Sequence, residues 1–295
     1  MKVELLDFKE LDNYPSGSGI EFYDDKVFLV GEAAGDLLVM NKKWKKPERI
    51  PLFTNKQQET QPALEAMTLL TVDKKPHLFI IGSGATPAGS KAVLLNLKTV
   101  LTIGEGVAGT QVIDLSNFYD RIKLSGLPVL NMEAVAVVYD YLVMVHRGNA
   151  DNPDNYLVIT RPGFWNDQQN APLQVVKIDF GAKAVKGMGI SGITYSDFHE
   201  DLFLTITTEA EPGSTETGKS WLGVIENLYR KIGREKVQMK VNELIDLPDA
   251  DKRFAGYTFE AVCIQSEKDH SMKMQLVADN ATGQTCLFKV QVWDL

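Results

Sequence analysis

Glu133-Ala134-Val135-Ala136-Val137 is the third of five copies of one short pattern that decides how this chain folds. In each copy an apolar residue or Gly precedes Ser or Glu, and a tiny, an aliphatic, a variable and an apolar residue follow. An internal repeat of this kind indicates a modular architecture. The other copies are Ser18-Gly19-Ile20-Glu21-Phe22, Glu65-Ala66-Met67-Thr68-Leu69, Ser191-Gly192-Ile193-Thr194-Tyr195 and Glu260-Ala261-Val262-Cys263-Ile264.

Short strand patterns follow each copy, and turn-forming residues separate them as in β-hairpins. About four strands in each repeating unit are typical of a β-propeller, whereas a pair of β-sandwiches would not produce five copies of one pattern. We therefore expect an all-β, five-bladed β-propeller that forms a single domain over residues 1–295, with blades that start near residues 18, 65, 133, 191 and 260. The expected inner strands span residues 17–23, 64–71, 132–138, 190–195 and 259–265.

The N-terminal segment should close the ring. Residues 2–10 alternate apolar and polar side chains, as a strand does, and they precede the first copy of the pattern. We expect this strand to pair with the last blade, because that pairing removes an exposed sheet edge. No stretch has the pattern of a long amphipathic helix. Only single helical turns are expected, at 117–123 and 241–246, and a fourth strand of the fourth blade is expected at 237–244.

The composition excludes several classes of partner. The formal net charge of −8 argues against nucleic-acid binding, which needs a basic surface. No apolar run approaches the roughly 20 residues of a spanning helix, and no basic amphipathic run suggests a membrane surface. The first residues lack the apolar core of a signal peptide, so we expect a cytoplasmic protein or an exported mature chain whose leader is absent. Cys263 and Cys286 lie in apolar runs and are expected to be buried thiols.

The repeated Ser or Glu should mark one end of the propeller's central channel. The innermost strand of each blade lines that channel, and the pattern opens this strand in every blade. The tiny residue that follows should face the next blade, where only a small side chain fits. Five side chains are therefore expected to converge near one end of the axis: Ser18, Glu65, Glu133, Ser191 and Glu260.

Converging carboxylates favour a bound cation. Like charges in a site with little water either take up protons or recruit a positive ion. Oxygen ligands suit Ca²⁺ better than Mg²⁺, and the set contains no His or Cys, which argues against Zn²⁺. Alternatively, these side chains hydrogen-bond to backbone groups and join the blades around water. Both interpretations stay open at this point.

Polar loops after the second strands should surround the same end of the channel, and functional residues are often carried on such loops. Arg147 is the cation expected to hold a small anionic ligand, unless it pairs with an acid such as Glu32 or Asp279. His146 is a candidate general base, although a His at the end of a strand is often structural. The expected ligand-binding residues are Glu32, His146, Arg147, Glu209 and Asp279, and no catalytic residue is assigned.

The order Ser, Glu, Glu, Ser, Glu on successive inner strands resembles that of the soluble calcium-activated nucleotidases (apyrases). The resemblance implies one Ca²⁺ in the central tunnel, bound at the five positions named above, and the hydrolysis of nucleotides. It covers the five motifs and the overall length but not the loops. Gly31-Glu32-Ala33-Ala34-Gly35 stands where the family has an Asp-Asp-Arg-type loop, and His146-Arg147 where paired arginines are usual. The chain is also similar to uncharacterised bacterial propellers related to phytase-like esterase domains.

Three functions follow from these features. The first is a Ca²⁺-dependent hydrolase of phosphate-containing or ester substrates, in which Glu32 or Asp279 orients water and Arg147 offsets negative charge. The second is a non-catalytic propeller that binds a ligand or a protein and whose tunnel ion is purely structural. The third is a lactonase-like enzyme, although that chemistry usually relies on a Glu, Asn and Asp set rather than one with two serines.

Overall fold

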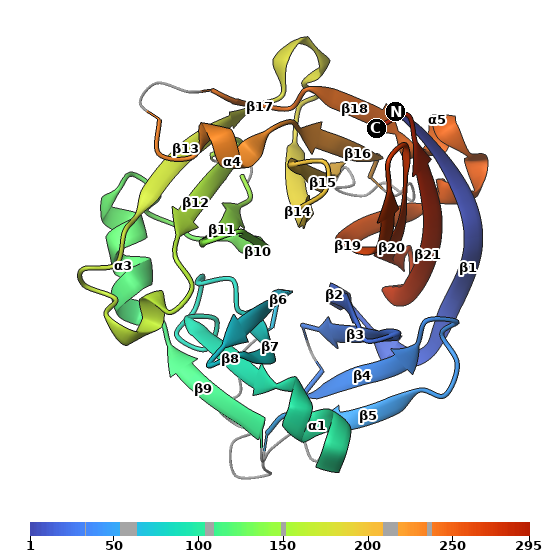
Figure 1. Cartoon of the computed structure of the whole chain (residues 1–295). Coiled ribbons are helices and arrows are strands. Elements are labelled where there is room, and N and C mark those ends of the chain that lie inside the picture. Colours follow the sequence, from blue (N-terminus) through green and yellow to red (C-terminus); the bar gives the residue numbers. More distant parts are fainter. Residues whose placement is uncertain (33, 54–63, 104–108, 149–151, 209–217, 235–237) are drawn as a thin grey trace.

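Five β-sheets stand around a central axis like the blades of a propeller (Figure 1), which confirms the predicted fold. The computed structural model describes residues 1–32, 34–53, 64–103, 109–148, 152–208, 218–234 and 238–295. Each sheet begins at the channel with one innermost strand and continues outward through antiparallel neighbours, except for one short parallel pair at the outer edge of blade 3. The innermost strands are β2 (Gly17–Tyr23), β6 (Ala66–Val72), β10 (Met132–Val138), β14 (Met188–Ser196) and β19 (Tyr257–Lys268).

The outer strands follow the chain order within each blade. Blade 1 adds β3 (Lys26–Gly31), β4 (Asp36–Asn41) and β5 (Glu48–Pro51), and blade 2 adds β7 (Lys75–Ile81), β8 (Lys91–Asn96) and β9 (Thr110–Asp114). Blade 3 adds β11 (Tyr141–His146), β12 (Tyr156–Thr160) and β13 (Gln174–Asp179). Blade 4 adds β15 (Asp201–Thr208), β16 (Ser220–Ile225) and β18 (Glu243–Asp246), and blade 5 adds β20 (Ser271–Asn280) and β21 (Gln284–Trp293).

Two-residue turns connect the first two strands of blades 1 and 2. Asp24 and Asp25 both have positive φ, at 50° and 59°, and they join β2 to β3. Asp73 and Lys74 do the same between β6 and β7, at 50° and 61°. Two successive residues with positive φ form the turn whose twist matches that of a hairpin. These turns lie at the opposite end of the inner strands from the repeated Ser or Glu.

The two ends of the chain close the ring, as predicted. Strand β1 (Lys2–Pro15) pairs antiparallel with β21 in a register that begins at Lys2 and Trp293. The rings of Phe8 and Phe288 lie 4.8 Å apart across this pair. Because β1 forms the outer strand of blade 5, the first and last segments of the chain complete one sheet.

Five hydrophobic clusters fill the spaces between neighbouring blades. One cluster joins Phe79 of blade 2 to Met144 of blade 3, and another joins Phe203 of blade 4 to Phe288 of blade 5. Burying one such side chain stabilises the folded state by about 1.5–3 kcal/mol. Cys263 and Cys286 are both buried free thiols, which confirms that prediction.

The predictions for residues 237–246 were wrong in detail. Met239–Lys240 forms β17, which pairs in parallel with β13 of blade 3, and Glu243–Asp246 forms β18 of blade 4. The chain therefore covers the outer edges of two blades in succession instead of forming one strand or a helical turn. This arrangement leaves fewer unpaired backbone groups at the rim.

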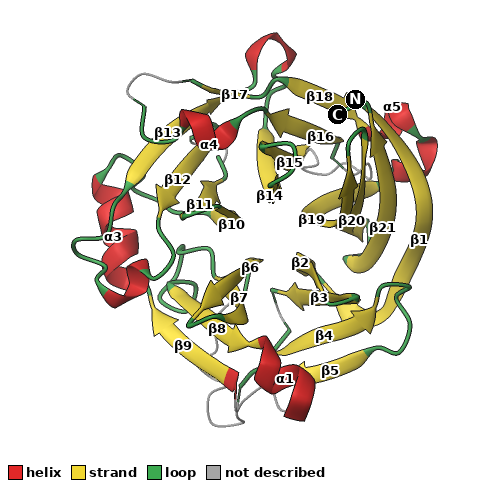
Figure 2. Ribbon diagram, viewed as in Figure 1, coloured by secondary structure: helices red, strands yellow, loops and turns green. Residues whose placement is uncertain are grey.

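Helices are short and are found mainly at the rim, where Figure 2 shows α1, α3 and α5. The single turn expected at 117–123 is a helix of nine residues, α3 (Ser116–Leu124), which buries Phe118, Tyr119 and Ile122 against blades 2 and 3. The sequence pattern also missed α1 (Leu97–Ile103). The described residues also form α4 (Leu228–Lys231) and α5 (Leu247–Ala250), with short 3-10 helices at Phe164–Asn166, Gly181–Lys183 and Lys252–Phe254. Among the described residues, no helix has the length and apolar character needed to cross a membrane.

Candidate functional site

A β-bulge holds the repeated residue in four of the five blades. The register of the first two strands skips Ser18, Glu133, Ser191 and Glu260, so each is the extra residue of its bulge. Glu65 directly precedes β6, and its backbone N–H donates to the Ile81 carbonyl at 2.8 Å. A bulge leaves its extra residue outside the ladder and redirects its side chain. The five repeated residues thus occupy equivalent positions at one end of the inner strands.

The tiny residue after each bulge lies against the next blade, as predicted. A Cβ placed on Gly192 would lie 2.6 Å from the Ala261 Cα, and one placed on Gly19 would lie 3.1 Å from the Met67 nitrogen. Real Cβ atoms do not approach backbone atoms to 2.6 Å. The repeat therefore records the close approach of neighbouring inner strands as well as the residues beside the channel.

The two serines join neighbouring blades. Ser18 Oγ donates to the Leu64 carbonyl at 2.9 Å, and Ser191 Oγ donates to the Phe259 carbonyl at 2.5 Å. Each of these carbonyls belongs to the residue that precedes the repeated Glu of the next blade. Both serines are buried, with 8% and 1% of their surfaces exposed. This hydrogen bonding gives the serines an inter-blade role that needs no metal ion.

The glutamates gather with two further acids into what we call the acidic mouth, which consists of Glu32, Glu65, Glu133, Glu260 and Asp279. Burial and the nearby Glu32 and Glu133 carboxylates raise the pKa of Glu65 to about 8. Burial also raises the pKa of Glu260 to about 8, and Glu133 and Asp279 add to this effect while Arg147 opposes it. These acids come from blades 1, 2, 3 and 5 and repel one another at the end of the channel.

Of the two further acids, Asp279 is more buried than Glu32. Its Oδ1 atom is buried and has no hydrogen-bond partner among the described residues. Burial and the Glu32 carboxylate raise the pKa of Asp279 to about 6. Glu32 itself is exposed, on the turn that follows β3. The sequence placed both acids in loops at the channel mouth; Glu32 is on a turn, but Asp279 lies in β20.

Arg147 brings a positive charge to the acidic mouth. Its Nη1 atom lies 3.9 Å from Glu133 Oε2, and its Nη2 atom donates to Thr207 Oγ1 at 3.0 Å. The aliphatic part of the Arg147 side chain lies over Gly189. A Cβ placed on Gly189 would come within 2.8 Å of Arg147 Cγ. Thr207 was expected beside the channel mouth as part of the polar segment 207–209, whereas Gly189 was missed; Gly189 lies in β14 and Thr207 in β15. Arg147 thus pairs with an acid, as one alternative predicted, but with Glu133 rather than Glu32 or Asp279.

His146 does not reach a surface that a ligand could use. Only 1% of it is exposed, and its Nδ1 atom accepts a hydrogen bond from the Asn131 N–H at 3.1 Å. Burial lowers the pKa of His146 to about 4, so the ring is neutral at pH 7. The structure therefore gives His146 a structural environment. Glu209, the remaining expected ligand-binding residue, lies outside the described residues.

The acidic mouth has suitable metal-ion donors but no ready ligand set. Carboxylate oxygens are the donors that Ca²⁺ prefers. Within the described ranges, however, no three Asp, Glu, His or Cys side chains are grouped closely enough to hold a metal ion. The sequence correctly brought the carboxylates to one end of the channel, but their side chains do not meet at one point.

Comparisons with known proteins establish the fold and the family. Glutaminyl cyclase from Myxococcus xanthus is 11% identical, and the match covers 98% of this chain and 95% of that one with a TM-score of 0.53. A luciferin-regenerating enzyme is 8% identical over 96% of this chain and 94% of its own, with a TM-score of 0.46. The comparison with curated proteins gave no match. At these identities the structural likeness concerns the fold alone, and the likeness to apyrases stays a prediction. The model of one family, DUF6929, a family of unknown function, matches residues 13–292, and the chain therefore belongs to that family.

Proposed function

We propose that the acidic mouth binds a divalent cation, Ca²⁺ in preference to Mg²⁺, and that Glu65, Glu133 and Glu260 are its main ligands. The observation that carries this proposal is the charge balance of the site. Among the described residues, five carboxylates share this end of the channel with the single guanidinium of Arg147. Such a site is short of positive charge, and a bound cation would relieve the repulsion.

The chemistry of the donors favours Ca²⁺. The site offers carboxylate oxygens from three repeated glutamates and two neighbouring acids, and Ca²⁺ accepts six to eight oxygen ligands in variable geometry. Mg²⁺ demands a more regular arrangement of ligands and gives up water reluctantly. Since the side chains are not grouped as a ready site, ion binding would require the glutamates to turn toward a common point. The ordering of these long side chains opposes binding and should keep the affinity moderate.

The test measures how Ca²⁺ changes thermal stability. Chelator-treated protein should gain melting temperature when Ca²⁺ is added, because a ligand that binds only the folded state stabilises it, by about 2.7 kcal/mol at 100 times its dissociation constant. Mg²⁺ should produce a smaller gain. Glu133→Gln should remove most of the Ca²⁺-dependent gain, whereas Glu267→Gln, at the other end of the channel, should leave it unchanged. An unchanged melting curve in the presence of Ca²⁺ would refute the proposal.

A second function, hydrolysis of phosphate-containing or ester substrates, is favoured by the position of Arg147. Its guanidinium lies 3.9 Å from Glu133, and 12% of the Arg147 side chain is exposed, so a positive group lies beside the proposed ion site. The ion would supply Lewis-acid activation of a substrate oxygen or of water. Arg147 would hold an anionic substrate group, and Glu32, which is exposed at the rim, would accept a proton from water.

An activity assay separates this function from a purely structural ion. ATP, ADP, GDP and simple aryl esters are incubated with the protein in the presence of Ca²⁺ and after chelation. Hydrolysis that requires Ca²⁺ and falls at least tenfold in Arg147→Ala would support the enzyme. If the protein binds Ca²⁺ but hydrolyses none of these substrates, the result favours a propeller that binds a ligand or a protein and whose ion is structural.

A further inference from the structure

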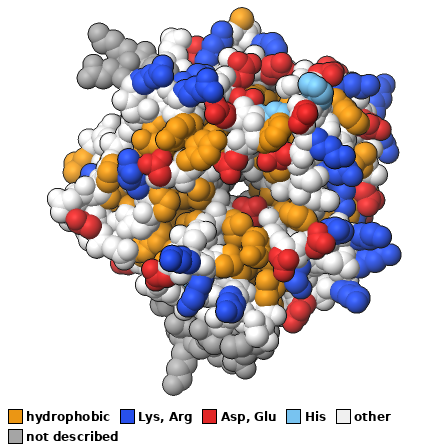
Figure 3. Space-filling model, viewed as in Figure 1, with side chains coloured by type: hydrophobic (Ala, Val, Ile, Leu, Met, Phe, Trp, Pro, Cys, Tyr) orange, Lys and Arg blue, Asp and Glu red, His pale blue; other side chains and the backbone are white. Residues whose placement is uncertain are grey.

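A cavity opens at the other end of the channel. It has a volume of about 520 Å³, and all five inner strands contribute to its lining. We call it the far cavity. In four blades the lining includes the residue three positions after the repeated Ser or Glu, namely Glu21, Thr68, Ala136 and Thr194, and in blade 5 it starts at Ile264. A space-filling view of the disc shows an opening at its centre, bordered by hydrophobic and acidic side chains (Figure 3). The volume lies within the range of about 300–1,000 Å³ that is usual for ligand pockets.

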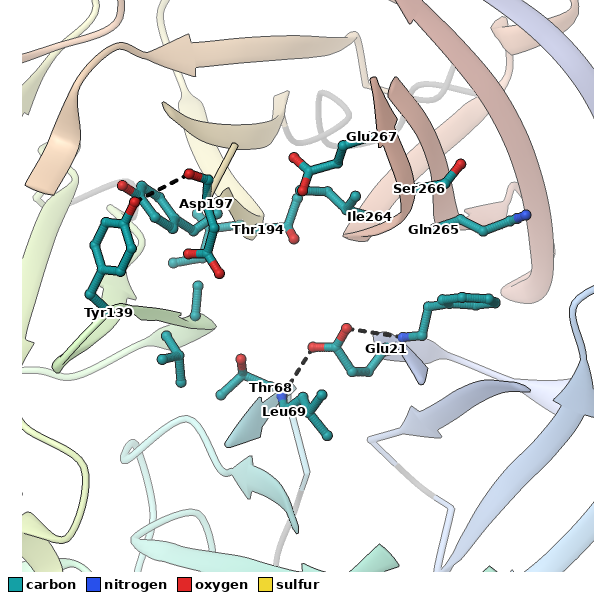
Figure 4. A pocket seen from close by; sticks show the side chains of 15 residues that line it. Glu21, Thr68, Leu69, Tyr139, Thr194, Asp197, Ile264, Gln265, Ser266 and Glu267 are labelled. Carbon is teal, nitrogen blue, oxygen red and sulfur yellow. Dashed lines mark hydrogen bonds between the residues drawn. The ribbon is translucent and has the colours of Figure 1, made fainter. Parts of the chain in front are cut away.

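Three carboxylates line the far cavity without a basic partner. Glu21 belongs to blade 1, Asp197 to the turn after β14, and Glu267 to blade 5. Figure 4 shows the three side chains on different sides of the opening. None of the 15 lining residues is Lys, Arg or His. Within the part of the chain that the structure describes, no ion pair involves any of these three acids.

Hydrogen bonds fix two of these carboxylates in place. Glu21 Oε1 accepts from the Phe22 N–H at 2.9 Å, and Glu21 Oε2 accepts from the Leu69 N–H at 3.1 Å (Figure 4). The second bond reaches from blade 1 to blade 2. Glu267 Oε1 accepts from Ser196 Oγ, which joins blade 5 to blade 4. Each carboxylate oxygen has lone pairs beyond those already used, so both groups remain acceptors for a ligand.

Aromatic and aliphatic surfaces separate the three acids. Tyr139 and Tyr195 form an edge-to-face pair with ring centroids 5.6 Å apart, and the Tyr139 hydroxyl donates to the Asp197 carbonyl at 3.2 Å. Leu69 and Ile264 add aliphatic surface to the lining. An inorganic ion gains nothing from such walls, whereas an alkyl chain can pack on them and an ammonium group is attracted to an aromatic face.

We propose that the far cavity binds an aliphatic polyamine, whose ammonium groups contact Glu21, Asp197 and Glu267 and whose methylene segments lie on the apolar walls between them. The cavity and the aromatic wall are observations independent of the acids, and together they indicate an organic cation. Several separated carboxylates match a chain that carries more than one positive charge. This inference does not depend on the cation proposed for the acidic mouth, because the two sets of residues lie at opposite ends of the inner strands.

Isothermal titration calorimetry with spermidine tests the proposal. The double variant Asp197→Asn with Glu267→Gln should bind spermidine about 25-fold more weakly than the unmodified protein, since each lost charge pair is expected to cost about fivefold. Both substitutions keep the size of the side chain. Glu32→Gln, which removes one charge from the acidic mouth, should leave the spermidine affinity unchanged. Glu21→Gln should weaken binding too. Because Glu21 and Glu267 both join two blades, Asp197→Asn alone is the decisive single variant, since its side chain makes no inter-blade hydrogen bond among the described residues, and it should weaken binding about fivefold.

Two ligand controls separate recognition from simple charge attraction. 1,8-Octanediol has a similar length without charge, and Mg²⁺ has charge without a methylene chain. Both should bind the far cavity at least tenfold more weakly than spermidine. The proposal is wrong if spermidine does not bind, or if its affinity falls equally in the double variant and in Glu32→Gln. If the unmodified protein binds spermidine but not Ca²⁺, only the proposal for the acidic mouth is refuted.

Discussion

The acidic mouth and the far cavity lie on the same five strands, yet the repeat describes only the first of them. At the acidic mouth every blade presents Ser or Glu, four of them in a bulge. Three residues further on, the far cavity is lined in four blades by Glu21, Thr68, Ala136 and Thr194, whereas the equivalent Cys263 of blade 5 is buried. Close contact between inner strands restricts the tiny residue that follows the repeated Ser or Glu, whereas an open cavity leaves the residues that line it free to differ. The repeated pattern therefore reflects the packing of the inner strands more directly than it indicates a binding site.

The largest effect is expected when a methyl group is added where two inner strands are in close contact. Gly192→Ala places a Cβ 2.6 Å from the Ala261 Cα and 2.5 Å from Thr205 Oγ1, so blades 4 and 5 must move apart. Because overpacking of this kind costs about 1–3 kcal/mol, we expect a loss of about 3 kcal/mol of unfolding free energy. Urea unfolding followed by circular dichroism measures it.

Thr194→Val, two residues along the same strand, is the matched control. Thr194 lines the far cavity and is partly exposed. Substitutions away from tight packing usually change stability by less than about 0.5 kcal/mol. A similar loss in both variants would show that the two ends of the strand are equally constrained, and the comparison would fail.

The next largest effect is expected from the serine hydroxyl that joins blades 4 and 5. Ser191→Ala removes the donor to the Phe259 carbonyl and leaves that carbonyl in a buried place. A buried polar group without its partner costs about 1–3 kcal/mol, so we expect a loss of about 2 kcal/mol in the same urea experiment. Ser266→Ala, at an exposed residue that lines the far cavity, should have little effect. Equal stability of the two variants would argue against an inter-blade role for Ser191.

Much of the architecture could be predicted because it depends on local patterns. The repeat located the start of every blade, and alternation in the first ten residues indicated the strand that closes the ring. Residues 237–246 were misplaced because two short strands of different blades follow one another with little to separate them in the sequence. Helix α3 was underestimated, since its buried side chains pack on residues such as Phe79 and Phe164, which are distant from the helix in the sequence.

The sites were predictable to different degrees. The position of the acidic mouth could be predicted from the repeat. The direction of each side chain could not, because it depends on a bulge and on long-range contacts such as that of Arg147 with Gly189. His146 ends an entirely apolar strand, and that context could have indicated its burial. Glu21 stood in the variable position of the first copy. Its channel-facing neighbours, Thr68 and Thr194, are polar too, which is the signal that could have revealed the far cavity.

The smallest expected effect concerns the protonation of Glu21. Backbone N–H donors hold this carboxylate, whereas the carboxylates of the acidic mouth repel one another. Burial raises the pKa of Glu21 to about 7, against the opposing effect of hydrogen bonds from the Phe22 and Leu69 N–H groups. Between about pH 4.5 and pH 7 the folded protein therefore holds a proton that the unfolded chain has lost. The contribution of Glu21 to stability is fully present below this interval and is lost as the pH rises through it.

Glu21→Gln should remove this contribution. One such proton changes the unfolding free energy by at most about 1.4 kcal/mol per pH unit, so the variant should lose stability more slowly than the unmodified protein as the pH rises from 5 to 7. Urea unfolding at half-unit intervals, without added amine or Ca²⁺, measures both slopes. The acids of the acidic mouth titrate alike in the two proteins, because Glu21→Gln leaves them in place, so the difference between the slopes belongs to Glu21. Parallel slopes would mean that the two N–H donors keep Glu21 ionised, and the far cavity would then hold its full negative charge throughout this pH range.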